Sequence, residues 1–186
     1  IKTIFDSFHH PDFRQKVTAQ VKKDLMGDLG NVPSVGFFGT PEDENFEFIY
    51  TGHHVTRRCN AHTDKGMGFG GAPIFYGNFG EAFHESKDHP GNPYWYQGLL
   101  FNEFVKTLDA KQQETALIAG GHPRSERSQE VIRKKAGDWP GLPCADLSSD
   151  QQTELLATIR KMLVMFREDD VEATMQSLEN NRAMEN

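Results

Sequence analysis

Five of the eight histidines in this chain lie in two short stretches that flank a glycine-rich segment. The first stretch is residues 51–62 (TGHHVTRRCNAH), the second is residues 83–92 (FHESKDHPGN), and GMGFGGAPIFYG occupies residues 66–77 between them. Imidazole both ligates transition metals and titrates near neutral pH. The two stretches therefore indicate a functional site, although they do not identify its reaction.

Three residues of these stretches are candidate metal ligands. His54 shares one face of an expected strand with Arg58, whereas strand alternation directs His53 to the other face. Glu85 and His89 are four residues apart on an expected turn. Two imidazoles and one carboxylate form the ligand set of many non-haem iron sites and open zinc sites. We therefore predict that His54, Glu85 and His89 hold a divalent ion (iron, zinc or copper). The competing interpretation is a structural strand end with one buried and one exposed histidine.

A substrate-binding role is predicted for Arg58, Tyr94 and Trp95. The planar guanidinium of Arg58 suits a carboxylate or phosphate, so it is the candidate catalytic residue and the group that grips an anionic substrate. Tyr94 and Trp95 either wall a ligand pocket or cover the core at a helix start. Cys59 follows two arginines, which predicts a lowered thiol pKa and a weak candidate nucleophile. His9, His10 and His122 are expected on the surface.

Several other kinds of site are excluded by motif. The glycine segment lacks the G-x-G-x-x-G pattern of a dinucleotide-binding fold and the Gly-Lys-Ser/Thr of a phosphate loop. The chain contains no C-x-x-C-H, so no covalent c-type haem is expected, and no H-E-x-x-H. The glycine segment is then either a tight inter-strand connection or a backbone that approaches a ligand closely.

Composition limits the class of protein. The 186 residues are 37% hydrophobic and 25% charged, with a net charge of −7, which is typical of a globular domain and disfavours a nucleic-acid groove. The longest apolar stretches are a few residues, so no membrane span is expected. Two cysteines are too few for a disulfide scaffold, and two unpaired thiols are favoured over one bridge. The chain begins at Ile1 within sequence that is predicted to be helical, so we expect a missing upstream segment.

Hydrophobic periodicity predicts an α+β fold. Period-two patterns predict a small antiparallel sheet over about residues 35–76, with strands at residues 35–38, 45–50, 54–60 and 72–76. An i, i+4 apolar stripe predicts a helix over residues 11–26 before the sheet.

The rest of the chain is predicted to be helical. Helices are expected over residues 93–107 and from Asp109 to about residue 119, the second opened by a capping box with Gln112. Ser148 and Gln151 form another capping box, which opens one unbroken helix over residues 148–167 that buries Leu156, Ile159, Leu163 and Phe166. Asp169 with Glu172 is expected to cap a last, thinly apolar helix. We expect one domain over residues 1–186, with residues 168–186 as a helical tail.

Several of these motifs together resemble a family of bacterial domains of unknown function, the family numbered thirty-five hundred. The shared features are a Gly-x-His before a strand that ends in arginine, a GGPIFYG-like segment, an N-E-x-x-D-H-P-G-N-x-Y-W-Y-Q segment and a downstream helix pair of the LDxxQ type. They correspond here to Gly52 and His54, Arg58, residues 70–77, residues 85–97 and residues 108–112, within a match over about residues 35–167. This chain departs from the pattern at Asn78, where the family has His, and at His84, where it has Asn. The resemblance implies export, periplasmic or otherwise, and a site at His54, Arg58, Glu85 and His89, but no assigned reaction.

Two functions are consistent with the sequence. The first is a metal-dependent enzyme, an oxidoreductase or hydrolase, that acts on a small anionic substrate. The second is a non-catalytic binding domain or accessory subunit whose C-terminal helices dock a protein partner.

Overall fold

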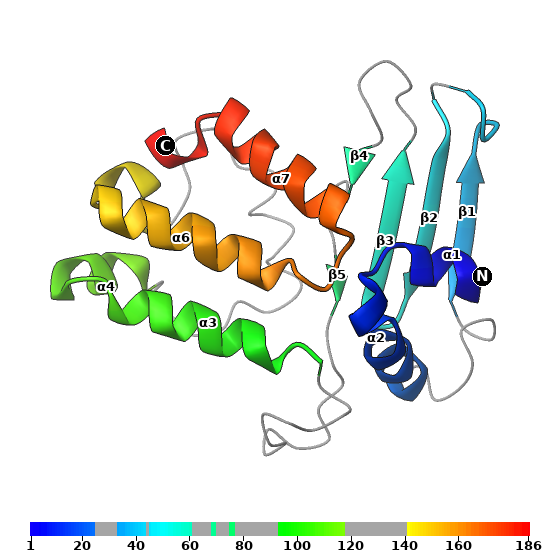
Figure 1. The fold of residues 1–186 in the computed structure, drawn as a ribbon, viewed down its shortest axis with the longest axis horizontal. Helices are drawn as coiled ribbons and strands as arrows, with labels where there is room; N and C mark the ends of the chain where they lie inside the picture. The colour runs from blue at the N-terminus through cyan, green and yellow to red at the C-terminus, as the bar shows by residue number, and fades with distance from the viewer. Residues whose placement is uncertain (25–32, 44, 61–67, 70–74, 77–92, 118–140) are drawn as a thin grey trace.

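The computed structural model describes residues 1–24, 33–43, 45–60, 68–69, 75–76, 93–117 and 141–186. An antiparallel sheet is covered on one face by two N-terminal helices, and the remaining helices lie beside it (Figure 1). The predicted α+β class, with a small antiparallel sheet between an N-terminal helix and C-terminal helices, is confirmed.

The sheet is built on three strands: β1 (Ser34–Phe38), β2 (Glu47–Gly52) and β3 (Val55–Asn60). They are consecutive antiparallel neighbours in the order β1-β2-β3. Two short strands, β4 (Gly68–Phe69) and β5 (Phe75–Tyr76), both pair with β3. The predicted strands thus lie within a few residues of those observed.

Strand alternation gives the sheet two different faces. Phe48 and Tyr50 of β2 and Val55 of β3 are 4%, 0% and 2% exposed, because their side chains face the helices. Thr56 and Arg58 alternate with the buried positions of β3 and are only partly covered. The face of β3 opposite the helices is therefore polar.

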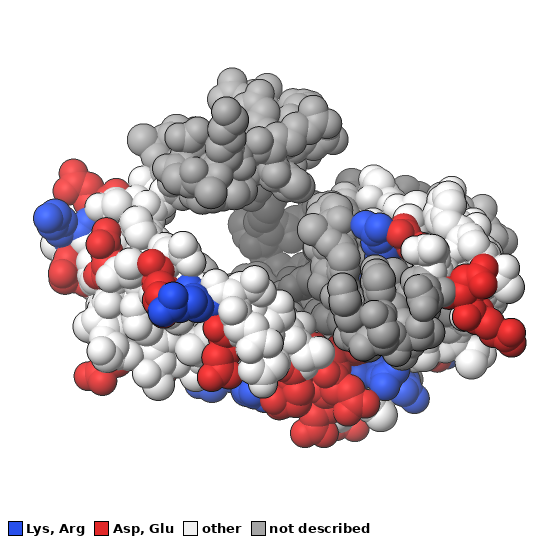
Figure 2. Space-filling view, turned by 90° about the horizontal axis from the view of Figure 1, so that it is seen from above, with Lys and Arg blue, Asp and Glu red and all other residues white. Residues whose placement is uncertain are grey.

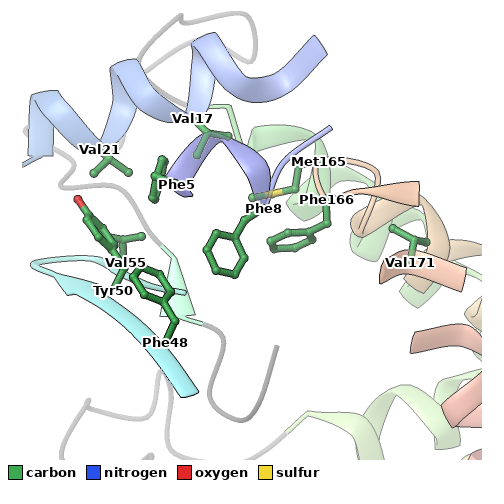
Figure 3. Close-up of a cluster of buried hydrophobic side chains, with 10 residues drawn as sticks. All are labelled: Phe5, Phe8, Val17, Val21, Phe48, Tyr50, Val55, Met165, Phe166 and Val171. Atoms are coloured by element: carbon green, nitrogen blue, oxygen red, sulfur yellow. The ribbon is translucent and has the colours of Figure 1, made fainter. Parts of the chain in front are cut away.

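Two helices close the apolar face: α1 (Lys2–Ser7) and α2 (Pro11–Asp24). Pro11 suits the first helical turn, and Val17 and Val21 are one helical turn apart, so both enter the core. Figure 3 shows the resulting main core between these helices, the sheet and the segment that precedes α7. Its buried members are Phe5, Phe8, Val17, Val21, Phe48, Tyr50, Val55, Met165, Phe166 and Val171.

The second half is helical, and its helices are α3 (Trp95–Lys106), α4 (Ala110–Ala116), α6 (Ser149–Met162) and α7 (Glu168–Asn180), with short 3₁₀ turns η1 (Cys144–Asp146) and η2 (Ala183–Glu185). A separate small core of Phe104, Leu108, Leu147 and Leu155 joins α3 to α6. Both capping boxes predicted here, Asp109 with Gln112 and Ser148 with Gln151, are confirmed. No helix in the described part of the chain is both long and apolar enough to span a membrane.

The prediction of one unbroken helix over residues 148–167 is wrong. α6 ends at Met162, and the chain turns before α7 begins at Glu168. The turn allows Met165 and Phe166, which are 0% and 1% exposed, to enter the main core. The apolar spacing in the sequence thus extends past the end of α6, because Phe166 is buried against the other half of the molecule rather than along a helix face. Within α6 the buried residues are Leu155 and Thr158 rather than Leu156 and Ile159, which are half-buried.

The predicted cap of the last helix is also wrong. Arg167 occupies the N-cap position of α7 without a side-chain cap, and Glu172 pairs with Arg160 of α6 instead. This helix has no capping box. Three acidic residues in its first turn instead complement the positive end of the helix dipole.

Candidate functional site

His53 and His54 form the two-residue connection between β2 and β3. Gly52 pairs with Val55, so the histidines stand at the tip of the hairpin. The prediction that they point to opposite faces is wrong, because strand alternation does not apply within a turn. Their rings lie 4.0 Å apart between centroids at 31°. The side chain of His54 is half-buried and that of His53 is exposed.

Arg58 lies on the polar face of β3 and forms an ion pair with Glu47 of β2. Its Nη2 donates to Oε2 of Glu47 at 2.5 Å, and the two side chains are 36% and 22% exposed. Glu47 lies two residues along β2 from Ile49, the register partner of Arg58, so the contact is diagonal across the strands. The ion pair leaves Arg58 partly open to solvent.

The neighbouring Arg57 is buried, and it reaches His9 across the core. The residue is 2% exposed, and its Nε and Nη2 lie 3.1 and 3.0 Å from Nε2 of His9. Its guanidinium carbon lies 5.7 and 5.4 Å from the ring centroids of Phe5 and Phe166, within cation–π range. A buried charge is thus held by hydrogen bonds and by aromatic faces.

His9 is fully buried at 0% exposure, so the expectation that it lies on the surface is wrong. Its Nδ1 donates to the carbonyl oxygen of Phe5 at 2.9 Å, which leaves Nε2 as the acceptor for Arg57. Burial, together with the charge of Arg57, lowers the pKa of His9 from 6.5 to about 3. His9 is therefore neutral at physiological pH.

Sequence reasoning missed this pair, although two signals for it were present. His9 follows Phe5 by four residues, a spacing that in a helix places both on one side, and Arg57 lies two residues from the buried Val55, on the same face of the strand. A His-Arg pair is rarely expected in a core, because both groups can be charged.

Cys59 does not have the environment of a nucleophile. It and Cys144 are free thiols, as expected. Burial raises the pKa of Cys59, and the negative charges of Asp170 and Glu47 raise it further. The predicted lowering by the adjacent arginines is wrong, because Arg57 binds His9 and Arg58 binds Glu47.

Tyr94 and Trp95 line a pocket of about 420 Å³ at the start of α3, together with Gly98, Leu99 and Asn102. Tyr94 also packs against the main core, and its hydroxyl donates to Oε1 of Gln20 at 3.4 Å. The two sequence interpretations, pocket wall and core cover, therefore both describe Tyr94. Leu99 is 45% exposed beside this pocket.

The remaining predicted ligands, Glu85 and His89, lie outside the described residues, as do His62, His84, His122 and most of the glycine segment. Within the part of the chain that the structure describes, no three His, Cys, Asp or Glu side chains gather closely enough to hold a metal ion. His54 is thus the one predicted ligand whose position is given.

A family model described as Protein of unknown function (DUF3500) matches residues 20–185. The chain belongs to this family. No curated protein and no solved structure matches it. The matched region includes the whole described sheet and every described helix after it, whereas α1, His9 and most of α2 precede it. In this member of the family, residues before the matched region thus complete the core beneath Arg57.

Proposed function

We propose that this protein is a metal-dependent enzyme that acts on a small anionic substrate. In this proposal His54, Glu85 and His89 hold a divalent ion, Arg58 orients the substrate, and Tyr94 and Trp95 wall its pocket. Two imidazoles and one carboxylate would hold such an ion, and the ion would supply Lewis acidity towards a substrate oxygen or a water. Either an oxidoreductase or a hydrolase uses such chemistry.

The observation that carries the substrate class is the geometry of Arg58. A guanidinium has five N–H donors, and among the described residues Glu47 is the partner of Arg58, through Nη2. Donors therefore remain for a carboxylate or phosphate, and more than a third of the side chain is exposed. Glu47 fixes the position of the guanidinium before a ligand arrives, which reduces the entropy lost on binding.

The net charge of the chain favours a small anionic ligand over a polyanion. Figure 2 shows acidic side chains interspersed with basic ones on one face of the molecule, in keeping with the net charge of −7. An acidic surface repels a polyanion over a Debye length, whereas one exposed guanidinium still binds one anionic group at contact.

Elemental analysis tests the metal half of the proposal. Protein purified without chelators should contain, or accept, about one equivalent of iron, zinc or copper. His54→Ala and His89→Ala should each abolish this binding. His10→Ala is the matched control, since His10 is also a partly exposed histidine but lies outside the proposed site. Failure of the unsubstituted protein to load any of the three metals contradicts the proposal.

The second candidate function is a non-catalytic binding domain or accessory subunit. It is favoured by apolar side chains that the helical half leaves exposed, such as Leu99 and Phe101 of α3 at 45% each. This function predicts a stable folded protein that retains no metal, so the same analysis separates the two candidates.

A further inference from the structure

β1 is an edge strand of the described sheet, and its own sequence carries none of the usual protection of an edge. It pairs with β2 in an unbroken register of five residues, and no strand among the described residues pairs with its other side. Edge strands normally avoid association through charged residues, prolines or bulges. The strand sequence SVGFF contains no charge, no proline and, in its pairing with β2, no bulge.

Both faces of this edge present aromatic rings to solvent. Phe37 is 60% exposed, although its ring contacts Phe46 and Phe48 on the core side. Phe38 is 57% exposed on the opposite face, beside its register partner Glu47. Arg58 neutralises that carboxylate, so no uncompensated charge borders the ring.

We propose that two copies of this chain associate through β1, which pairs antiparallel with β1 of the second copy about a two-fold axis at Gly36. In this register Gly36 faces its equivalent, and each Val35 faces a Phe37. Pairs between an aromatic and a β-branched residue stabilise antiparallel strands. Each Ser34 faces a Phe38, so every position of the strand meets an uncharged partner. The inference is independent of the proposed enzymatic function.

Gly36 gives the strand a shape that fits its own copy. A Cβ added at Gly36 would lie 2.9 Å from Cε2 of Phe38, so the aromatic ring already covers the glycine of its own strand. In the proposed register Phe38 is also the diagonal neighbour of Gly36 of the second copy. Two rings and two glycines then form one continuous apolar layer on the outer face. Covering an edge glycine with an aromatic ring is a recognised way to stabilise a sheet.

The charges around β1 favour an antiparallel arrangement, and the absence of charge within β1 makes a second copy of the same strand a suitable partner. The loop after β1 carries Glu42 and Asp43, both exposed. An antiparallel pair places the two acidic loops at opposite ends of the interface, whereas a parallel pair would bring them together. In a chain that is 25% charged, an uncharged five-residue strand is complementary to another uncharged strand, and β1 itself is one.

Analytical ultracentrifugation of the full chain from low micromolar to millimolar concentration tests the association. We expect a concentration-dependent dimer, because one added strand pair makes a small interface of modest affinity. Phe38→Lys should weaken dimerisation at least about tenfold, since edge lysines oppose strand pairing. Leu117→Lys is the matched control, because Leu117 is 74% exposed in the other half of the molecule. A monomer at every concentration, or a dimer that Phe38→Lys leaves intact, overturns the proposal.

Cysteine cross-linking tests the register and remains informative if Phe38→Lys does not fold. Opposed residues of an antiparallel pair have Cα atoms about 4.5–5.5 Å apart, within disulfide range. Ser34→Cys mixed with Phe38→Cys should therefore give a cross-linked dimer on mild oxidation. Ser34→Cys alone should not, because its two copies lie about 13 Å apart along the strands. The unsubstituted chain controls for Cys59 and Cys144, and a mixture that does not cross-link overturns the proposal.

Discussion

At the scale of single residues, the buried pair of His9 and Arg57 makes the fold sensitive to pH. Nε2 of His9 accepts from Arg57, so protonation there removes the acceptor and places two cations together in the core. The folded pKa of about 3 lies below the ordinary value of 6.5. The contribution of His9 to stability is therefore complete above pH 6.5 and is lost as the pH falls towards 3.

This linkage predicts a measurable difference between the protein and His9→Gln. From about pH 7.5 to about pH 5.5, the free energy of unfolding of the unsubstituted protein should fall by about 1.4 kcal/mol more than that of the variant, since one titrating group differs between them. Urea unfolding at the two pH values measures this difference. Equal losses in both proteins would show that His9 is not held neutral.

Arg58 leads to a prediction about ligands rather than about stability. Arg58→Lys keeps the charge beside Glu47 but loses the planar fork. Its affinity for inorganic phosphate, used as the simplest oxyanion, should fall about tenfold or more, while the free energy of unfolding changes by less than about 0.5 kcal/mol. NMR titration and urea unfolding measure the two quantities.

Arg160→Lys is the matched control for this substitution. Arg160 also donates to a carboxylate, that of Glu172, and its side chain is 46% exposed. The control should leave phosphate binding unchanged. Loss of folding in Arg58→Lys would instead make Arg58 a structural ion-pair residue and would remove the basis of the anionic substrate class.

At the scale of elements, two capping boxes are joined into one network. Gln112 closes the box of α4 and Gln151 closes that of α6. Their side-chain amides also bond each other, since Nε2 of Gln112 lies 3.0 Å from Oε1 of Gln151, and Nε2 of Gln151 lies 2.8 Å from Oε1 of Gln112. Each amide further donates to a backbone carbonyl, of Asp146 and Thr107 respectively. The starts of two helices are therefore stabilised together.

A double-mutant cycle should detect this coupling. Gln112→Ala and Gln151→Ala should each destabilise the protein, and the double variant should differ from their sum by about 0.5–3 kcal/mol, because both remove the same bonds. Thermal and urea unfolding of the four proteins give the coupling energy. The double variant of Gln112→Ala with Gln176→Ala, a residue of α7, serves as the uncoupled control. If the effects of Gln112→Ala and Gln151→Ala were simply additive, the amide pair would contribute nothing.

These elements also show which parts of the structure the sequence could predict. Local signals were sufficient where the determinants are local, as at the capping boxes of Asp109 and Ser148. They were insufficient where distant segments decide the outcome. The helix ends after Met162 because Phe166 packs beside His9. The backbones of these two residues, which are far apart in the sequence, form an isolated antiparallel bridge.

The candidate site was predictable only in the same limited sense. The face of Arg58 followed from alternation, whereas its partner Glu47 depends on the register between two strands. The arrangement of His53 and His54 depends on the position of the hairpin turn. A shift of the strand register by one residue would place both side chains differently.

At the scale of the whole molecule, the N-terminal residues join the two halves. The amide of His10 donates to the carbonyl of Met165 at 2.9 Å, and the rings of His9 and Phe166 stack at 6.0 Å. The same segment covers the sheet, since the ring of Phe5 lies 5.1 Å from that of Tyr50. Figure 3 shows Phe8 between Phe48 of the sheet and Phe166 of the turn before α7, and Phe5 between α2 and Tyr50. Residues before the family match therefore complete a core that the matched region supplies only in part.

This arrangement predicts that the N-terminal helix is indispensable to the fold. Deleting residues 1–10 should abolish cooperative unfolding, because it exposes Tyr50 and Phe166 and leaves Arg57 buried without His9. Phe5→Ala should cost about 3–5 kcal/mol, whereas Ile4→Ala, one residue away but 40% exposed, should cost less than about 1 kcal/mol. Circular dichroism and urea unfolding provide both readouts. A deletion variant that unfolds cooperatively at native-like stability would show that the sheet and the C-terminal helices are held together without α1.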